Sequence, residues 1–175
     1  MVARDAMPNT DFRIRRATPS DADAIARTHL DSIETIGPQF YPAEIVSEWS
    51  SGLTPDRYRG AMDRGEVFFI AVDEQGTMLG FSTHRVDGTQ HGTAVYVRGS
   101  TVRRGVGSAL YRLAEADAVS AGAKSIVIDA SLAAVEFYKA HGFEETGRGD
   151  HRLRSGCLMP CVFMRKALHH AATFR

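Results

Sequence analysis

The sequence has no apolar run long enough to cross a membrane and no excess of charge of either sign. Its 21 Lys and Arg residues equal its 21 Asp and Glu residues, so no overall field attracts nucleic acid or an anionic membrane surface. The first twelve residues include aspartates and lack the apolar segment of a secretory signal. We therefore expect a cytoplasmic protein that binds neither nucleic acid nor membrane.

Cysteine is scarce as well, since only Cys157 and Cys161 are present. Two residues at this spacing lack the second ligand pair of a zinc site. On a strand they would share one face about 13 Å apart at ~3.3 Å per residue, too far for a disulfide with each other. The adjacent His169 and His170 are too few for a metal site. We expect no metal, and we predict that both cysteines are small buried hydrophobes, not activated thiolates that carry an acyl group.

A clear order of elements is present instead. Apolar residues with a period of two, or in short continuous runs, predict strands, and 3.6-residue spacing predicts helices. The strands are expected at residues 12–16, 67–72, 78–86, 91–97, 125–129, 144–152 and 158–166. The helices are expected at residues 22–33, in a broken stretch between Pro42 and Gly65, after Gly107 as far as Ala121, and at residues 131–141.

Three further features support this order. Thr18, Pro19 and Asp21 are typical of a helix start, with a capping hydroxyl, a proline in the first turn and a nearby carboxylate. Turn residues at 73–76 and 87–88 predict antiparallel hairpins. Because we find no repeat and no linker, we expect one α/β domain at residues 12–168, with tails at residues 1–11 and 169–175.

Two glycines, Gly105 and Gly107, lie between paired arginines and an amphipathic run. Each weakens a helix by roughly 1 kcal/mol relative to alanine, so their place at a helix start needs a reason. A P-loop is excluded because Ser108 and Ala109 follow where Lys and Ser or Thr are required, and Leu110 disfavours a dinucleotide fingerprint. The remaining ligand is a pyrophosphate held by backbone N–H groups without Mg²⁺. An ordinary tight turn is the alternative.

A second motif, DASLAAVEFYKAHGF at residues 129–143, closes a strand, opens a helix and ends in Gly-Phe. With the hairpins before it and two strands after it, this order resembles the GNAT superfamily of acyl-CoA-dependent N-acetyltransferases. The cofactor loop of that family reads Gln/Arg-x-x-Gly-x-Gly/Ala, and its next motif reads Asn-x-x-Ala-x-x-Phe/Leu-Tyr-x-x-x-Gly-Phe. The corresponding residues here are Val102, Gly105, Gly107, Ser131, Ala134, Phe137, Tyr138, Gly142 and Phe143. The ending MRKAL is similar to the family's Met-x-Lys-x-Leu.

Two positions depart from the family pattern. Val102 stands where the family has Gln or Arg, so a side-chain contact to phosphate is missing there, although Arg103 and Arg104 lie close by. Ser131 stands where the family has Asn, and its hydroxyl can still donate and accept a hydrogen bond. A plain helix N-cap is the alternative role for Ser131.

The resemblance implies a mixed, mainly antiparallel sheet of six to seven strands, with helices on both faces and a splay between the fourth and fifth strands. It implies acetyl-CoA as the acyl donor, with its pantetheine arm against Tyr96, Val97 and Arg98. Around the pyrophosphate we expect Arg103, Arg104, Gly105, Val106, Gly107 and Ser108, and elsewhere on the cofactor Ser131, Phe137 and Tyr138.

The resemblance also implies direct acetyl transfer to a primary amine, with Tyr138 as the general acid. The alternative role for Tyr138 is that of a packed aromatic whose hydroxyl merely finds a partner. The competing functions are a non-catalytic acyl-CoA-binding module of the same fold and, with less support, a Rossmann-like dehydrogenase.

The sequence does not single out a general base. His84 is of a residue type suited to proton transfer, and the other candidates are Asp87, His91, Glu48 and Trp49. A water chain is the alternative to any of them. The acceptor is left open as a small-molecule or peptide amine, although the acidic and aromatic residues between positions 28 and 64 suit a cation. The oligomeric state is open too, a homodimer included.

Overall fold

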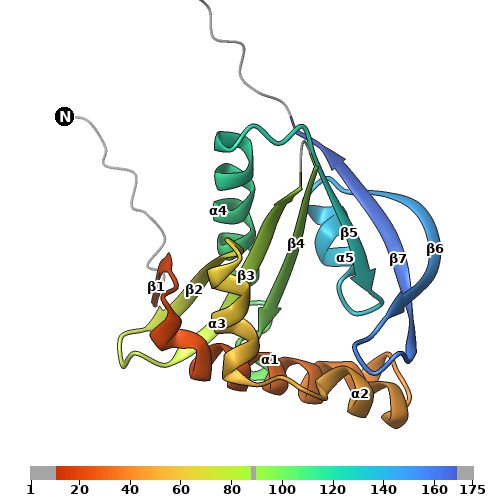
Figure 1. Ribbon diagram of the computed structural model, residues 1–175, viewed down its shortest axis with the longest axis horizontal. Helices are drawn as coiled ribbons and strands as arrows, with labels where there is room; N and C mark the ends of the chain where they lie inside the picture. Colours follow the sequence, from red (N-terminus) through yellow and green to blue (C-terminus); the bar gives the residue numbers. More distant parts are fainter. Residues whose placement is uncertain (1–10, 88–89, 169–175) are drawn as a thin grey trace, which may run out of the picture.

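The computed structural model describes residues 11–87 and 90–168, which build a seven-stranded sheet with helices on both faces (Figure 1). The strand order is β1-β2-β3-β4-β5-β7-β6. The strands are β1 Phe12–Arg16, β2 Val67–Asp73, β3 Met78–Asp87, β4 Gln90–Val97, β5 Ser125–Ser131, β6 Glu144–Arg152 and β7 Leu158–Ala167. Neighbouring strands are antiparallel except β4 and β5, which are parallel. The predicted mixed sheet is confirmed. The predicted tails and the His169–His170 pair lie outside the described residues, apart from Asp11.

Helices pack on both faces of this sheet because neighbouring strand residues point in opposite directions. The α-helices are α1 Ala22–Ile36, α2 Ala43–Ser50, α3 Pro55–Asp63, α4 Val106–Ser120 and α5 Val135–Ala140. On β2, Ile70 packs with Ile25 of α1, whereas the next residue, Ala71, packs with Leu110 of α4. Helices α1 and α3 therefore cover one face and α4 the other. In the described ranges no helix is long and apolar enough to span a membrane.

The start of α1 follows the predicted cap. Thr18 precedes a 3₁₀ turn, Pro19–Asp21, that leads directly into α1. The Thr18 N–H donates to the Asp21 carboxylate at 2.8 Å, and Arg15 donates to the same carboxylate at 2.7 and 2.8 Å. The hydrogen bonds from Arg15 are the main reason why the pKa of Asp21 is lowered to about 2.

The predicted helix at residues 131–141 is too long. Ser131 is the last residue of β5, where it pairs with Cys161 of β7, and α5 begins only at Val135. The N-cap of α5 is Ala134, so the N-cap role considered for Ser131 is wrong. The β5–β7 ladder continues through Ser131, and this tertiary pairing overrides the local helical pattern.

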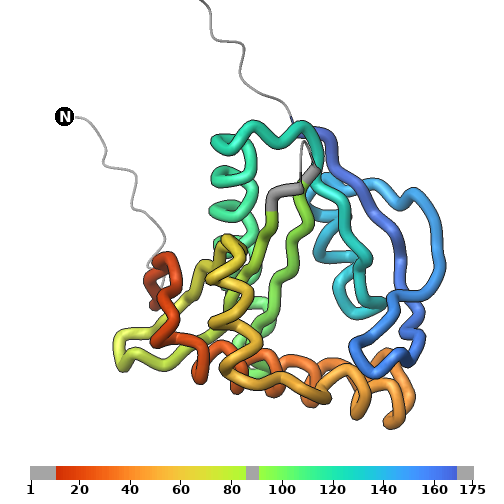
Figure 2. Tube along the Cα trace, viewed as in Figure 1, coloured from red at the N-terminus to blue at the C-terminus, as the bar shows by residue number. Residues whose placement is uncertain are grey.

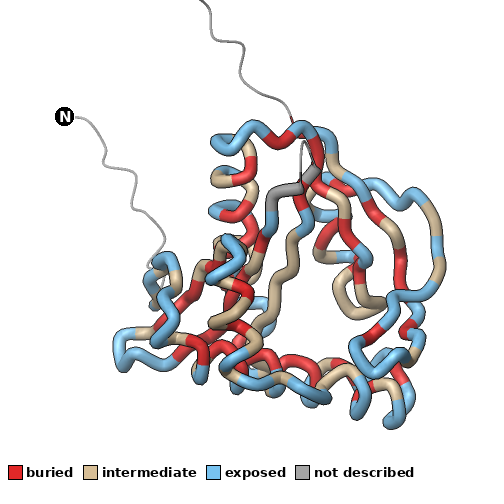
Figure 3. Tube along the Cα trace, viewed as in Figure 1, coloured by how far each residue is buried: buried red, intermediate tan, exposed pale blue. Residues whose placement is uncertain are grey.

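Strands β4 and β5 pair over only three positions and then diverge (Figure 2). The pairs are Gln90 with Ser125, His91 with Ile126, and Gly92 with Val127. Beyond Gly92, β4 keeps β3 as its partner while β5 pairs with β7. Most of β4 is accordingly half-buried, whereas β2 is mostly buried (Figure 3). The splay between the fourth and fifth strands is present.

An arm formed by α1, α2 and the turn between them runs along the end of the sheet where the two strands are far apart (Figure 1). Tyr41 in that arm is buried, and its hydroxyl donates to the Pro160 carbonyl at 2.8 Å. The same hydroxyl accepts from the Leu132 N–H at 2.7 Å. Tyr41 therefore fastens the arm to β7 and to the turn after β5.

Candidate active site

The N-terminus of α4 is preceded by two residues with left-handed backbone. Arg103 has a φ of 64°, and Gly105, the N-cap of α4, has a φ of 79°. Glycine adopts this conformation without the steric conflict of a Cβ. The first helical hydrogen bond runs from the Ala109 N–H to the Gly105 carbonyl at 3.0 Å, and no described side chain caps the helix. The N–H groups of residues 106–108 thus have no partner within the helix and lie at the positive end of its dipole.

Gly107 has a different reason to be glycine. A Cβ at this position would lie 3.3 Å from the Phe137 ring and 3.6 Å from the Val97 side chain. The first of these contacts is tight, so a side chain would push the start of α4 away from α5. One glycine therefore sets the backbone of the loop, and the other allows its close packing.

A cavity of about 460 Å³, here called the loop cavity, lies beside this helix N-terminus. It is bounded by α1, the end of β4, the loop before α4 and the turn from β5 into α5. The predicted cofactor contacts that line it are Tyr96, Val97, Arg103, Gly105, Gly107, Ser108, Ser131 and Phe137. Val102 also lines it and is 45% exposed. The loop predicted from the glycines therefore faces a space that can hold a ligand.

Four predicted contacts lie outside this lining: Tyr138, which lines the second cavity described below, and Arg98, Arg104 and Val106. Arg98 donates from Nε to a backbone carbonyl of β3 at 2.7 Å, and its guanidinium lies 3.9 Å from Asp31. Arg104 lies 3.9 Å from Asp11. Val106 is 1% exposed in the core, so only its backbone faces the loop.

A second cavity of about 530 Å³, here called the sheet cavity, lies where β4 and β5 diverge. Along β5, Ile126 and Ile128 pack on the side of α4 and α5, so Val127 and Asp129 face the opposite side. Gly92 is part of its lining, and a Cβ there would meet no atom within 4 Å. The residues that line both cavities are Trp49, Val95, Tyr96, Ser131 and Ala134. The two cavities therefore adjoin at the splay.

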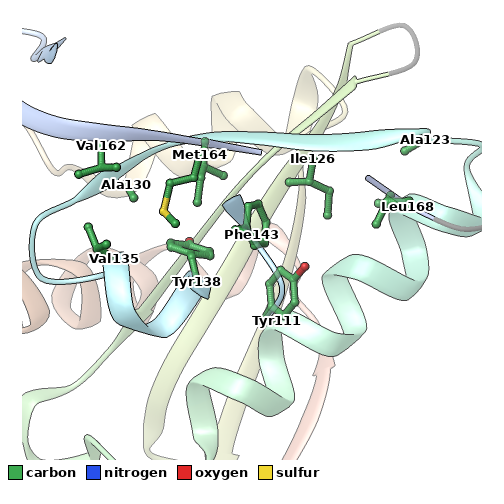
Figure 4. Packing of buried hydrophobic residues seen from close by; sticks show 12 residues of the cluster. Tyr111, Ala123, Ile126, Ala130, Val135, Tyr138, Phe143, Val162, Met164 and Leu168 are labelled. Atoms are coloured by element: carbon green, nitrogen blue, oxygen red, sulfur yellow. The ribbon is translucent and has the colours of Figure 1, made fainter. Parts of the chain in front are cut away.

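Tyr138 lines the sheet cavity from α5 and is 4% exposed. Its ring lies beneath β5 and β7, with Val135 on one side and Phe143 on the other (Figure 4). The ring centroids of Tyr138 and Phe143 are 5.1 Å apart. Burial is the main reason why the pKa of Tyr138 is raised, with Tyr96 contributing, while the Val95 backbone opposes the shift. The hydroxyl therefore keeps its proton at neutral pH and is available as a donor.

Tyr96 stands at the junction of the two cavities and is held by aromatic neighbours. Its ring centroid lies 3.8 Å from that of His29 on α1 and 6.4 Å from that of Trp49 on α2. The His29 Nδ1 is 2.8 Å from the Tyr58 hydroxyl. Burial lowers the pKa of His29 to about 3 and raises that of Tyr96 to about 12, so both rings are neutral. This neutral cluster therefore contributes two aromatic rings, Tyr96 and Trp49, to the lining that the two cavities share.

Most base candidates named from the sequence do not line either cavity. His84 is 2% exposed, and its Nε2 lies 2.8 Å from Asp117 of α4. His91 is buried with its ring stacked against His84 at 6.1 Å. Glu48 is exposed and outside both linings. Trp49 lines both cavities but has no basic atom. The side chain of Asp87 lies outside the described part of the chain.

A histidine–carboxylate pair that the sequence analysis missed lines the sheet cavity. His151 of β6 and Asp129 of β5 are both about half exposed, and Nδ1 lies 2.9 Å from Oδ2. The two strands are not neighbours, because β7 lies between them. No local signal in the sequence indicates this pair, since it depends on the order of the strands.

Neither cysteine lines the loop cavity or the sheet cavity. Both are free; Cys161 is 2% exposed and Cys157 is half-buried, just before β7. Burial is the main reason why the pKa of the Cys161 thiol is raised, with Asp129 contributing, so this thiol is protonated. Over the described residues, no group of three His, Cys, Asp or Glu side chains is placed to hold a metal ion.

Comparison with known proteins identifies the family. Residues 37–168 match the family model described as an acetyltransferase (GNAT) domain, and the chain belongs to this family. A GCN5-related N-acetyltransferase from Rhodopseudomonas palustris is 27% identical, with a TM-score of 0.81 over 93% of this chain and 99% of that one.

Two more distant structures share the fold and were solved with cofactor. The PaiA N-acetyltransferase of Thermoplasma acidophilum, in complex with coenzyme A, is 14% identical with a TM-score of 0.70, over 90% of this chain and 99% of that one. YncA, a putative acetyltransferase of Salmonella typhimurium with acetyl-CoA, is 20% identical with a TM-score of 0.69, over 94% and 98%. No curated protein matches the sequence.

Proposed function

We propose that this protein is an N-acetyltransferase that moves the acetyl group of acetyl-CoA to a primary amine. The observation that carries the proposal is the junction of two cavities at the β4–β5 splay, one beside an uncapped helix N-terminus and the other beside Tyr138. Acetyl-CoA occupies the loop cavity and the amine occupies the sheet cavity. The presence of CoA and acetyl-CoA in the PaiA and YncA structures supports the same donor here.

The residues of the loop cavity fit this donor. The free N–H groups of residues 106–108 lie where the pyrophosphate binds, and backbone donors at a helix N-terminus hold such an anion well. Beyond Gly92, the edge of β4 that faces the splay has no strand partner. An amide-containing chain such as pantetheine can pair with that edge as an added strand does. Arg103 and Ser108 supply side-chain donors at the phosphates.

The chemistry requires the amine to lose a proton before it attacks. A lysine-like amine has a pKa of about 10.4 and is mostly protonated at neutral pH. The neutral nitrogen attacks the thioester carbonyl carbon, the C–S bond breaks, and its electron pair leaves on sulfur. One proton leaves the nitrogen and one reaches the sulfur, so the products are an amide and the CoA thiol. Tyr138, with its proton retained, donates its O–H to the departing sulfur.

We assign the general base to His151, held by Asp129. When the Nδ1–H donates to the Asp129 carboxylate, Nε2 carries the lone pair and can accept a proton from the amine. The carboxylate also stabilises the imidazolium that forms. Both residues line the sheet cavity together with Tyr138. The proposed acid, Tyr138 on α5, and the proposed base, His151 on β6, therefore line the same cavity around one acceptor.

The function is tested by substituting Tyr138. Tyr138→Phe keeps the ring and removes the donor, so we expect the rate of thiol release to fall by about 100-fold, with acetyl-CoA affinity unchanged by calorimetry. Tyr111→Phe is the matched control, because Tyr111 belongs to the same buried cluster but lines neither cavity. Unchanged turnover in Tyr138→Phe would remove this residue from the mechanism. Acetyl-CoA binding without thiol release for any amine would identify a non-catalytic acyl-CoA-binding module instead.

A further inference from the structure

The sheet cavity has an unusual charge for a site that receives an amine. Its acidic and basic lining residues are Arg85, Arg165, Asp129 and His151. The carboxylate of Asp129 is already engaged by His151. Neither arginine side chain forms an ion pair or hydrogen bond with any other described residue. The cavity therefore offers two guanidinium groups without a protein partner in the described chain.

The two arginines lie in one row of the sheet. Arg85 pairs with Gly92 across β3 and β4, Gly92 pairs with Val127 across β4 and β5, and Val127 pairs with Arg165 across β5 and β7. Residues paired in this way point to the same face. Three strand spacings of ~4.8 Å separate the two arginine backbones by about 14 Å, a distance that two extended side chains can bridge. Between them lies Gly92, where no side chain fills the space.

The polar groups of the sheet cavity follow one another along β5. Val127, Asp129 and Ser131 face the same side at every second residue. Val127 lies in the arginine row, Asp129 carries the histidine pair two residues on, and Ser131 belongs to the lining shared with the loop cavity. Each step is ~6.6 Å. The cavity therefore has three zones along β5. The two arginines lie at the end where β4 and β5 are paired, the proposed base lies in the middle, and the junction with the loop cavity lies at the far end.

The acidic residues of the α1–α2 region do not offset the positive charge of the two arginines in the sheet cavity. Glu34, Glu44 and Glu48 are exposed and outside the cavity lining, and Asp31 accepts a hydrogen bond from the Gly99 N–H at 2.9 Å. The expectation that acidic residues of this region favour a cationic amine is therefore not supported by their positions. A polyamine would place its second positive charge beside two arginines, which costs electrostatic energy.

We propose that the acceptor is a primary amine that also carries a carboxylate a few bonds from the nitrogen, as an amino acid does. Arg85 and Arg165 bind the carboxylate, and Asp129 with His151 receives the amine. Guanidinium groups suit this anion because they offer paired N–H donors in one plane. This inference rests on the proposed acetyltransferase function, since it assigns the acceptor of the same site.

The experiment compares each of the common amino acids with its carboxamide, which keeps the amine and removes the negative charge. Binding to the CoA-loaded protein is measured by calorimetry, and thiol release with acetyl-CoA is measured separately. For the best amino acid we expect its kcat/KM and its affinity to exceed those of its amide by at least about 10-fold, as loss of a charged hydrogen-bond partner predicts. Equal or better binding and turnover of the amides would overturn the proposal.

The variant Arg85→Gln/Arg165→Gln provides the second arm. We expect its affinity and kcat/KM for the amino acid to fall by about 10- to 100-fold, with those for the amide changed little. Arg112→Gln, an exposed arginine on α4 outside both cavities, is the matched control. An equal loss on the acid and the amide would contradict the assignment. Selective binding of the amino acid without thiol release would support this inference and refute the catalytic function. Thiol release with the amides alone would support the catalytic function and refute this inference.

Discussion

The loop cavity and the sheet cavity adjoin at one splay, yet different parts of the chain build them. The loop cavity is bounded by several elements, but the backbone N–H groups proposed to hold the pyrophosphate come from one continuous segment, residues 102–108, with Gly105 in a left-handed conformation. The sheet cavity takes its acidic and basic side chains from β3, β5, β6 and β7. Under the proposed function, donor recognition depends on local backbone conformation, whereas acceptor recognition depends on the order of strands. Substitutions on the two sides should affect different measurable quantities.

The largest effect is expected on the acceptor side. His151→Gln removes the proposed base, so kcat should fall by about 100-fold while calorimetry gives an unchanged affinity for acetyl-CoA. The difference in kcat between the variant and the unaltered protein should decrease as pH rises toward the pKa of the amine, because more of the acceptor is then neutral without a general base.

Two comparisons sharpen this prediction. Asp129→Asn should lower kcat as well, and the double variant should lose much less than the product of the two effects, because the residues act as a unit. Asp150→Asn alters the residue that precedes His151 on β6, on the opposite face and outside the cavity, and should retain full turnover. A loss of acetyl-CoA affinity in His151→Gln would contradict the assignment of donor binding to the loop cavity and acceptor binding to the sheet cavity.

A smaller effect is expected on the donor side. Gly105→Ala introduces a Cβ at a φ of 79° without a steric neighbour within 4 Å, so the change acts through backbone strain. We expect the acetyl-CoA dissociation constant to rise by about 10-fold, because ~1–2 kcal/mol of strain displaces the loop N–H groups.

The same helix offers a control for that strain. Gly122 follows α4 with a φ of 86° and has the same open surroundings. Gly122→Ala should lower the free energy of unfolding by a similar amount and leave acetyl-CoA affinity unchanged. Equal affinity losses in both variants would mean that the conformation at Gly105 has no special role in binding the donor.

This division also explains which parts of the site could be predicted from the sequence. The strands, the glycine loop and Tyr138 are encoded by residues close together in the chain, and the predicted mixed sheet with its splay is confirmed by the family match and the topology. Asp129 and His151 could not be paired in advance, because β7 lies between their strands. Arg85 and Arg165 likewise share a row only through the pairings of four strands.

One error in the prediction arose where tertiary pairing overrides the local pattern. The helix expected from Ser131 begins at Val135, because Ser131 extends the ladder with β7. The sequence leaves the face of His84 open, and the alternation of side chains along β3 directs this residue toward α4, where its Nε2 lies 2.8 Å from Asp117. The face that a strand residue adopts depends on what packs against the sheet, and this information is not local.

The smallest effect is expected at a region that touches neither cavity, the turn before α1. The pKa of Asp21 is lowered to about 2, mainly by Arg15, from about 3.9 in an unfolded chain. The stabilising contribution is therefore fully present above pH ~4 and is lost as pH falls through about 2. At neutral pH, Asp21→Asn should lower the free energy of unfolding by about 1 kcal/mol, a partly exposed pair being screened by solvent.

Thermal unfolding between pH 2 and 7 measures this contribution, and we expect Asp21→Asn to lower the Tm by about 2–4 °C at pH 7 and by less near pH 2. Asp23→Asn removes a carboxylate from the more exposed pair with Arg59 and should change the Tm less. Acetyl-CoA affinity and turnover should be unchanged in Asp21→Asn below its Tm, since neither cavity includes this turn. A change in either would mean that the position of α1 controls Tyr96 at the junction, and the two cavities would then be coupled through the arm.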